Sequence, residues 1–357
     1  MPGDAVRGLI EARPTISVGG REHEGLRGGL LTMIVEENIQ GLYRCEAMFG
    51  NWGPKNGTTD FLHFDRQTLD FGKTIEIAWE GKTLFLGKIF ALEANFPDGK
   101  APEITVLAED VLQDLRMTRR TRTFTDVSDA DVVRRIAQDH GLTSDVSIDG
   151  PTYKVLAQVN QSDLAFLRER ARLMGAELWV ADQTLGAKTR AARRGETIPL
   201  AYASQLRECV VTADLADQRT SVTVSGWDVS AKSRIKHEAT ESAIQSELNG
   251  DQSGISILRS SFGQRKESVA HTVPLTTREA QGEAETILRM TSRRFMRVRG
   301  RAEPDGRMRV GAYVELQRLG PLFDGKYYLT SVRHLFDGTS GMRIEFEAER
   351  PGIGRSQ

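Results

Sequence analysis

The sequence contains little of what marks several large classes of protein. Only two of its 357 residues are cysteines, Cys45 and Cys209, and both lie in apolar, strand-like stretches, which favours buried reduced thiols over a disulfide. No apolar run approaches the roughly 20 residues that span a bilayer, and the first residues include no apolar signal segment. We therefore expect a protein that folds in the cytoplasm and is exported only as part of a larger assembly.

The charge and the aromatic content argue against proteins that bind nucleic acid, anionic membranes or polysaccharides. The 48 basic and 49 acidic residues give a net charge of −1, which favours neither nucleic acid nor an anionic membrane. Aromatic residues make up only 7 % of the chain, and we expect most of them inside the fold. The expected inward-facing residues are Phe85, Phe96, Phe323, Phe336, Trp179 and Trp227. A standalone polysaccharide-binding β-protein, which would expose aromatic stripes, is therefore disfavoured.

Catalytic chemistry also lacks a sequence signature. The six histidines are scattered along the chain, at His23, His63, His140, His237, His271 and His334. No His-x-x-x-His, Cys-x-x-Cys or Gly-x-Ser-x-Gly motif occurs, so we expect no metal, no cofactor and no catalytic residue. Acidic pairs such as Glu109-Asp110 lie on expected strand edges and turns, where solvated carboxylates are usual. The alternative is an enzyme that degrades the cell envelope, a glycan hydrolase or a peptidase.

The most informative positive feature is a β-element that occurs twice. Each copy contains a glycine, a glutamate, a Phe-x-Gly-Lys motif and a later phenylalanine in the same order. Gly72 precedes Ile104 by 32 residues, and Gly311 precedes Ile344 by 33. The matching residues are Gly72, Glu76, Phe85, Gly87, Lys88 and Phe96 in one copy, and Gly311, Glu315, Phe323, Gly325, Lys326 and Phe336 in the other. Three chains with two similar domains each would present six near-equivalent faces.

Short apolar segments separated by glycine-rich turns predict β-structure before the first helix. The expected strands are 14–18, 29–35, 42–48, 74–79, 83–95 and 103–108. An N-cap signal at Ser128 predicts one helix, apolar residues at helical spacing predict a second from near Ser162, and a third is expected from about Thr277. The basic segment 116–122 lacks interleaved aromatics, which favours a solvated or subunit-bridging face over a phosphate site. The basic segment 186–195 predicts an exposed loop.

These patterns together predict an α+β, mainly β fold. We expect two similar antiparallel β-barrel, tube-like domains, the second of them interrupted, with a small α/β domain between them, because barrel closure removes exposed sheet edges. The expected boundaries are 1–112 for the first barrel, 113–200 for the α/β domain, 201–231 and 295–352 for the second barrel, and 232–294 for a polar and helical insertion.

The central segment carries a resemblance to a known family. It reads Phe124-Thr-Asp-Val-Ser-Asp-Ala-Asp131, then Gln158-x-Asn-Gln-Ser-Asp-Leu-Ala-Phe-Leu167, and later Ser225-Gly-Trp-Asp228. With these motifs nearly the whole chain resembles the phage late control gene D family, the baseplate hub of contractile tails, and the N-terminal half of VgrG proteins. The motif residues are Gln158, Asn160, Ser162, Asp163, Leu164, Phe166, Leu167, Arg170, Gly226, Trp227 and Asp228.

The resemblance implies a structural hub without enzymatic activity. In that family the hub is a homotrimer that adapts the sixfold inner tube to the threefold spike. The implied partners are an inner tube or tube-initiator hexamer, a trimeric spike protein, baseplate wedge proteins and, in the channel, the tape-measure protein. The implied location is a virion tail or tail-like injection particle assembled in the bacterial cytoplasm. VgrG-type chains continue into an OB-fold and a β-helical spike, so here we expect the spike to be a separate polypeptide.

Overall fold

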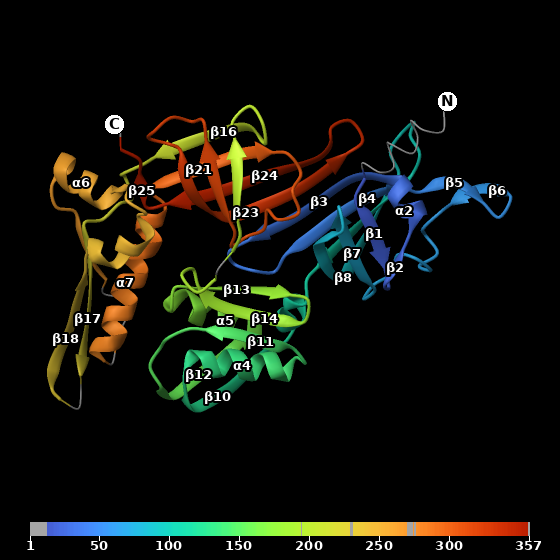
Figure 1. Cartoon of the computed structure of the whole chain (residues 1–357). Helices are drawn as coiled ribbons and strands as arrows, with labels where there is room; N and C mark the ends of the chain where they lie inside the picture. Colours follow the sequence, from blue (N-terminus) through green and yellow to red (C-terminus); the bar gives the residue numbers. More distant parts are fainter. Residues whose placement is uncertain (1–12, 194, 229–230, 270–273, 275, 356–357) are drawn as a thin grey trace. The chain divides into compact units, whose positions relative to one another are not determined.

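The computed structural model describes residues 13–193, 195–228, 231–269, 274 and 276–355, so the expectation for His271 lies outside the described residues. Strands predominate, which confirms the predicted α+β, mainly β class (Figure 1). The chain forms two compact units. The first contains the described residues of 1–113, 301–310 and 331–346, and the second those of 114–300, 311–330 and 347–357. The unit boundary falls inside three strands, β21 (Met296–Ala302), β23 (Gly325–Asp337) and β24 (Gly341–Arg350). The four-part division expected from the sequence stays a prediction.

The first unit is built on one antiparallel sheet. Its strand order is β24, β23, β3, β4, β9, β8, β7, β1 and β2. Besides β23 and β24, the sheet and its one associated helix consist of β1 (Thr15–Val18), β2 (Arg21–Glu22), α2 (Glu24–Gly29), β3 (Leu30–Asn38), β4 (Arg44–Gly50), β7 (Thr74–Trp79), β8 (Lys82–Asn95) and β9 (Glu103–Glu109). Glu80 and Gly81 join β7 to β8 with positive φ at both positions, as the tight hairpin predicted there requires.

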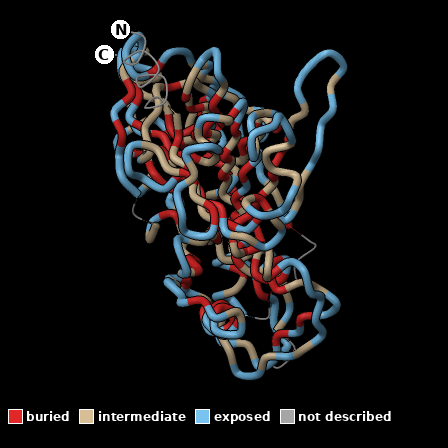
Figure 2. The backbone as a smooth tube through the Cα atoms, turned by 90° about the vertical axis from the view of Figure 1, so that its right-hand side faces the viewer, coloured by how far each residue is buried: buried red, intermediate tan, exposed pale blue. Residues whose placement is uncertain are grey.

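Strands near both ends of this sheet contribute side chains to one hydrophobic core, for example Ile16 from β1 and Phe336 from β23. The sheet therefore curls around one core, and buried segments lie inside while loops are exposed (Figure 2). Among the described residues the sheet is open, which corrects the expected closed barrel. The reason is local: the sheet ends at β2, which has two residues and is followed almost at once by α2, so the hydrogen-bonded ladder stops there and does not continue to the strands at the other end of the order.

A second feature of this unit escaped prediction. Strands β5 (Trp52–Lys55) and β6 (Thr58–Phe61) form a separate two-stranded hairpin that extends from the end of β4 (Figure 1). Gly53 and Pro54 interrupt the strand pattern here, since proline cannot donate to a ladder and is confined to edges.

The second unit contains the predicted helices α4 (Asp129–Asp139) and α5 (Asp163–Leu173). Ser128 and Asp131 form the expected capping box, and the Ser162 hydroxyl accepts the Ala165 N–H. The surrounding elements are α3 (Leu112–Arg116), β10 (Arg119–Val127), β11 (Thr143–Ser147), β12 (Tyr153–Ser162), β13 (Ala176–Ala181) and β14 (Thr184–Thr189). Strands β10 and β12 pair as a two-stranded ribbon, and β11, β14 and β13 form a small mixed sheet.

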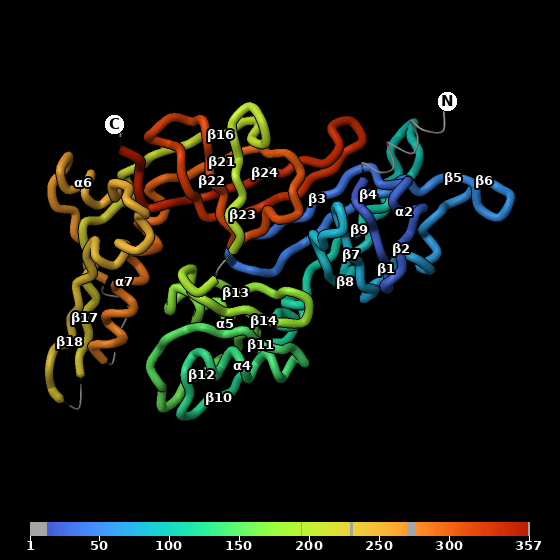
Figure 3. Tube along the Cα trace, in the orientation of Figure 1, coloured from blue at the N-terminus to red at the C-terminus, as the bar shows by residue number. Residues whose placement is uncertain are grey.

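The rest of the second unit surrounds the predicted third helix, α7 (Thr277–Arg293), which packs on β17 (Ser221–Asp228) and β18 (Ser233–Ala239) (Figure 3). The other elements are β15 (Thr197–Ala201), β16 (Leu206–Ala213), the 3-10 helix η1 (Glu241–Glu247), β19 (Gln252–Ser253), α6 (Gly254–Phe262), β20 (Lys266–Val269), β22 (Tyr313–Gln317) and β25 (Gly352–Ile353). None of the described helices is long and apolar enough to span a membrane.

Candidate functional site

Both copies of the repeated β-element fold as three-stranded antiparallel meanders. The first is β7–β8–β9 and the second is β22–β23–β24. Gly72 and Gly311 open them with φ of +76° and +95°. The N–H of Gly72 donates to the Ile89 carbonyl at 2.7 Å, and that of Gly311 donates to the Leu329 carbonyl at 3.2 Å. The two glycines thus start each meander in the same way.

The Phe-x-Gly-Lys motif lies in a different register in the two meanders. Gly87 pairs with Ile75, whereas Gly325 pairs with Leu316, two residues further along the first strand. A shift of two keeps each side chain on its own face of the sheet. Both glycines also lie against the end of the third strand: an added Cβ would come 2.3 Å from the Glu109 carbonyl oxygen at Gly87, and 2.4 Å from the Arg350 guanidinium at Gly325.

The remaining repeat residues divide between core and surface. Phe85 and Phe336 are buried, and Phe323 is half-buried. Phe96 is 63 % exposed, so the expectation that it faces the interior is wrong. Glu76 accepts a hydrogen bond from the Thr83 hydroxyl at 2.7 Å, Glu315 pairs across the strands with Lys326, and Lys88 is exposed.

The family-motif residues from Gln158 onward meet at the junction of β12 and α5. Leu164, Phe166 and Leu167 are buried, and the Phe166 ring stacks on Phe124 of β10 at 5.9 Å. Asn160 adopts a positive φ of 49°, and its N–H donates to the Thr121 hydroxyl at 3.1 Å. The motif therefore forms the irregular end of β12 and the start of α5.

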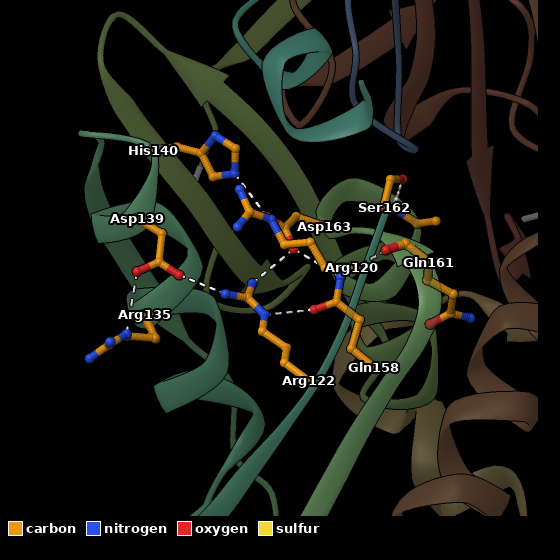
Figure 4. A network of polar contacts seen from close by, with 10 residues as sticks. Arg120, Arg122, Arg135, Asp139, His140, Gln158, Gln161, Ser162 and Asp163 are labelled. Carbon is orange, nitrogen blue, oxygen red and sulfur yellow. Dashed lines mark hydrogen bonds and ion pairs between the residues drawn. The ribbon is translucent and has the colours of Figure 1, made fainter. Parts of the chain in front are cut away.

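Asp163, the first residue of α5, lies at the centre of a polar network (Figure 4). Its side chain is 1 % exposed, and its Oδ1 accepts hydrogen bonds from Arg122 and Gln158, both at 2.8 Å. Its Oδ2 contacts His140 Nε2 at 2.9 Å and Arg120 Nε at 3.2 Å. The ribbon, the end of α4 and the start of α5 are thereby joined through one carboxylate.

The partners of Asp163 determine its charge. Burial acts to raise its pKa, but the hydrogen bonds from His140 and Gln158 and the charges of Arg122 and Arg120 outweigh burial and hold the pKa below its usual range. His140 caps α4 and also contacts this carboxylate. An ionised, fully coordinated aspartate of this kind is a structural link, because it has no free lone pair for proton transfer.

A second buried pair stabilises the other end of the same helices. Arg170 of α5 binds both oxygens of Asp129 at the start of α4, at 2.6 and 3.1 Å, and its guanidinium lies 4.8 Å from the Tyr153 ring centroid. Burial, with the charge of Asp129, raises the pKa of Tyr153 to about 12. The motif residue Arg170 thus fixes α5 to α4.

The later motif Gly226-Trp227-Asp228 lies at the end of β17. A Cβ on Gly226 would come 2.3 Å from the Pro274 carbonyl oxygen, so only glycine fits there. Trp227 is 52 % exposed, and our expectation that it lies in the core is wrong. Asp228 accepts the Ala231 N–H at 2.9 Å in the turn that follows.

Sequence reasoning missed a third buried network, in the segment predicted as an exposed loop. Residues 184–189 form β14, and Arg190 and Arg193 follow it. Glu177 accepts hydrogen bonds from Arg190 at 3.1 Å and from Arg193 at 3.0 Å, and it also accepts the Tyr328 hydroxyl of the second meander. Arg190 reaches Glu349 at 2.7 Å. The alternation of arginines with small residues gave no signal that acids distant in sequence would pair with them.

Together these contacts join elements that are distant in the sequence. In the described part of the chain no group of three or more His, Cys, Asp or Glu side chains could hold a metal ion. Burial raises the pKa of the Cys45 thiol well above its ordinary value, which disfavours the nucleophilic thiolate. What the arrangement does is to hold helices, ribbon and meander in fixed positions.

Comparison with solved structures places the fold. The 43 kDa tail protein of prophage MuSo2 from Shewanella oneidensis matches with a TM-score of 0.71 at 12 % identity, over 95 % of this chain and 98 % of that one. A tail protein from Neisseria meningitidis matches at 0.70 and 13 %, over 96 % and 97 %. A type VI secretion system component of E. coli, described as structurally similar to T4 bacteriophage tail proteins gp27 and gp5, matches at 0.54 and 12 %, over 92 % and 76 %. The chain has a fold found in phage tail proteins.

The sequence itself gives one family assignment. The family model of the Alg8 N-terminal domain matches residues 32–337, and the chain belongs to this family. The family is named after a domain, and its name states no activity. No curated protein matches the sequence.

Proposed function

We propose that this chain is a structural component of a contractile phage tail or a phage tail-like injection system, in the position of the baseplate hub. The observation that carries the proposal is the fold, which it shares over at least 95 % of its length with two phage tail proteins. The sequence resemblance to late control gene D proteins and VgrG proteins supports the same position. In this proposal the hub is a homotrimer that adapts the sixfold inner tube to a separate threefold spike.

The two meanders support the symmetry argument. A trimer of chains with one tube-like element each would offer three equivalent contacts, whereas two such elements per chain offer six. The shared opening glycines and the glycines at the third strand, Gly87 and Gly325, support a common origin of the meanders. Their two-residue difference in register supports near-equivalent rather than identical contacts with a tube hexamer.

The proposed role requires no enzyme activity. The buried acids Asp163, Asp129 and Glu177 are each bound by arginine, so their carboxyl oxygens are occupied. A glycan hydrolase needs one carboxyl with a raised pKa beside a second one in an open cleft. Burial raises the pKa of Asp110, but this carboxyl is buried and accepts backbone N–H groups instead of lining an open cleft, so we propose that the protein acts through its interfaces and not as an envelope-degrading enzyme.

The proposal is tested by mass and by assembly. Three chains of 39.6 kDa give about 119 kDa, and light scattering on the purified chain, alone and with its spike protein, should find that mass or a complex built on it. Deleting the gene should abolish assembled baseplates in electron micrographs of lysates, and the wild-type gene should restore them. A chain that stays monomeric with the spike, or normal particles without the gene, would contradict the hub assignment.

A further inference from the structure

Four aromatic rings gather on the surface of the first unit. This aromatic patch consists of Trp52, Phe61, Phe64 and Phe96, whose neighbouring ring centroids lie 5.0–6.2 Å apart. Trp52 is 46 % exposed and Phe96 is 63 % exposed. The chain has few aromatic residues, and clustered exposed rings usually mark an interface because they are the side chains that anchor protein contacts.

The rim of the aromatic patch is acidic. Asp60 lies on β6 beside Phe61, and Glu93 and Asp98 lie on either side of Phe96, all three of them exposed. Lys55, the basic residue of the hairpin, is already bound to Asp65 at 2.8 Å. The surface that covers the rings should therefore be apolar in its centre and basic at its edge.

The second unit exposes a surface of that description on the β10–β12 ribbon. Its outer side, the threonine–valine face, consists of Thr121, Thr123, Thr125, Val155, Ala157 and Val159, all exposed. Val155 and Val159 are 57 % and 63 % exposed. The inner side of the same ribbon is occupied, because Phe124 stacks on Phe166 of α5. Six uncharged side chains in succession on an open ribbon are unusual, since exposed sheet faces normally carry charges.

The threonine–valine face has a basic rim at one end. Arg119 and Arg120 lie exposed at that end of the ribbon, whereas Lys154 at the other end is paired with the exposed Asp126 at 3.1 Å. Arg120 also holds the buried Asp163, so its position is fixed by the fold. The acidic rim of the aromatic patch thus matches the basic rim of the threonine–valine face. The centre of the first surface consists of aromatic rings, and the centre of the second consists mostly of β-branched side chains.

We propose that the aromatic patch of one protomer packs on the threonine–valine face of a second copy. This rests on the homotrimer of the proposed function. A closed ring of three needs a head-to-tail contact, in which two different surfaces of the same chain meet. Packing of the aromatic patch on itself would bring Asp60, Glu93 and Asp98 against their own copies, which like-charge repulsion opposes.

Cysteine cross-linking tests which surfaces meet. Two differently tagged chains, one with Phe96→Cys and the other with Val159→Cys, are expressed together in cells that assemble the particle and treated with a short bifunctional maleimide. We expect a mixed dimer that carries both tags. The control replaces Val159→Cys by Val210→Cys, an equally exposed valine at 69 % on β16, and should give none. A dimer formed by Phe96→Cys chains alone would overturn the proposal.

Charge substitution gives an independent measurement. Val159→Glu places an acid against the acidic rim and should weaken trimer formation at least about tenfold, as expected at the centre of an interface. Val210→Glu should leave the mass distribution unchanged, and circular dichroism should show that both variants are folded. If trimers persist in Val159→Glu and no mixed cross-link forms, this pairing is wrong while the hub assignment stands. If the wild-type chain is monomeric both alone and with the spike, the hub assignment itself fails.

Discussion

Two aspartates, one in each compact unit, are almost equally buried and yet are held in opposite ways. Asp110 of the first unit is 5 % exposed and Asp163 of the second is 1 % exposed. Asp163 meets two arginines, a histidine and a glutamine. Asp110 accepts the backbone N–H groups of Tyr43 and Leu112, each at 2.9 Å, and its charged neighbours are acidic. Burial, reinforced by Glu109 and Glu37, raises the pKa of Asp110 to about 7, although both backbone hydrogen bonds act against it.

The difference shows that burial alone does not decide the charge of a carboxyl group. Desolvation acts on both residues in the same direction, and the outcome depends on whether cations are supplied. In the second unit, the ribbon brings two arginines to Asp163, and the carboxylate becomes an ionised link between elements. In the first unit, Asp110 holds a turn through backbone donors and takes up a proton near neutral pH.

Removing the Asp163 carboxylate should produce the largest loss of stability. Asp163→Ala removes one of the two acidic partners of the half-buried Arg122, and it removes the carboxylate that Gln158, His140 and Arg120 contact. We expect a loss of about 3–5 kcal/mol in the free energy of unfolding, as for other broken buried ion pairs. Urea denaturation followed by circular dichroism measures it. Asp126→Ala is the matched control, because its ion pair with Lys154 is exposed and should contribute less than about 1 kcal/mol. Equal losses in the two variants would contradict the network.

The pH dependence of stability should differ between the two aspartates. The folded-state pKa of Asp110 lies above its unfolded value, so its stabilising contribution is fully present below about pH 4 and is lost as pH rises through about 7. Asp163 has a lowered pKa, so its contribution is present above about pH 4 and is lost as pH falls through the folded-state pKa. Between about pH 5 and pH 8, Asp110 should therefore lower the free energy of unfolding by up to about 3 kcal/mol.

Asp110→Asn isolates that contribution, because the amide has nearly the same shape and does not titrate. We expect the variant to lose less stability than the wild type between the two pH values, as measured by urea denaturation at each. Asp60→Asn, an exposed acid in the same unit, should reproduce the wild-type slope. A wild-type slope in Asp110→Asn would show that the proton is taken up elsewhere.

The sequence predicted local structure around Asp163 better than it predicted the contacts of Asp163. Ser128 and Ser162 marked both helix starts, because capping depends on residues within one turn. The partners Arg120 and Arg122 depend on the register of β10 with β12, which includes an irregularity between these two arginines. Register is a tertiary property, and no local signal in the segment 116–122 gave it. The Glu177 network was missed for the same reason.

The aromatic patch shows a second limit. Phe96 is expected to face the interior of the predicted barrel, but it lies beyond the end of β8 and contacts Phe61 and Phe64 instead. The β5–β6 hairpin that carries Trp52 and Phe61 contains Gly53 and Pro54, so strand propensity gave no warning of it. The repeat was easier to see, since glycines at fixed backbone positions leave a sequence trace that side-chain pairing does not.

A smaller effect is expected when Asp163 loses only His140 and keeps its other partners. His140→Ala removes the 2.9 Å contact and leaves the arginines in place, so we expect a loss of about 1–2 kcal/mol. Thermal unfolding measures the change. His140→Gln keeps a side-chain donor at the end of α4 and should recover part of the loss. A loss in His140→Ala as large as that in Asp163→Ala would mean that the histidine, and not the carboxylate, links the elements.

The smallest effect should come from the most exposed partner. The Arg120 side chain is 41 % exposed and contacts Asp163 at 3.2 Å, whereas Arg122 is 24 % exposed and binds Asp163, Asp139 and Gln158. Arg120→Gln should therefore lower the free energy of unfolding by less than about 1 kcal/mol, and the loss should shrink in high salt because an exposed pair is screened. Arg122→Gln should produce a larger, salt-insensitive loss in the same urea titration. If both variants lose the same stability and both losses shrink in high salt, solvent reaches the Asp163 carboxylate. Asp163 and Asp110 would then differ in their exposure to solvent and not in their partners.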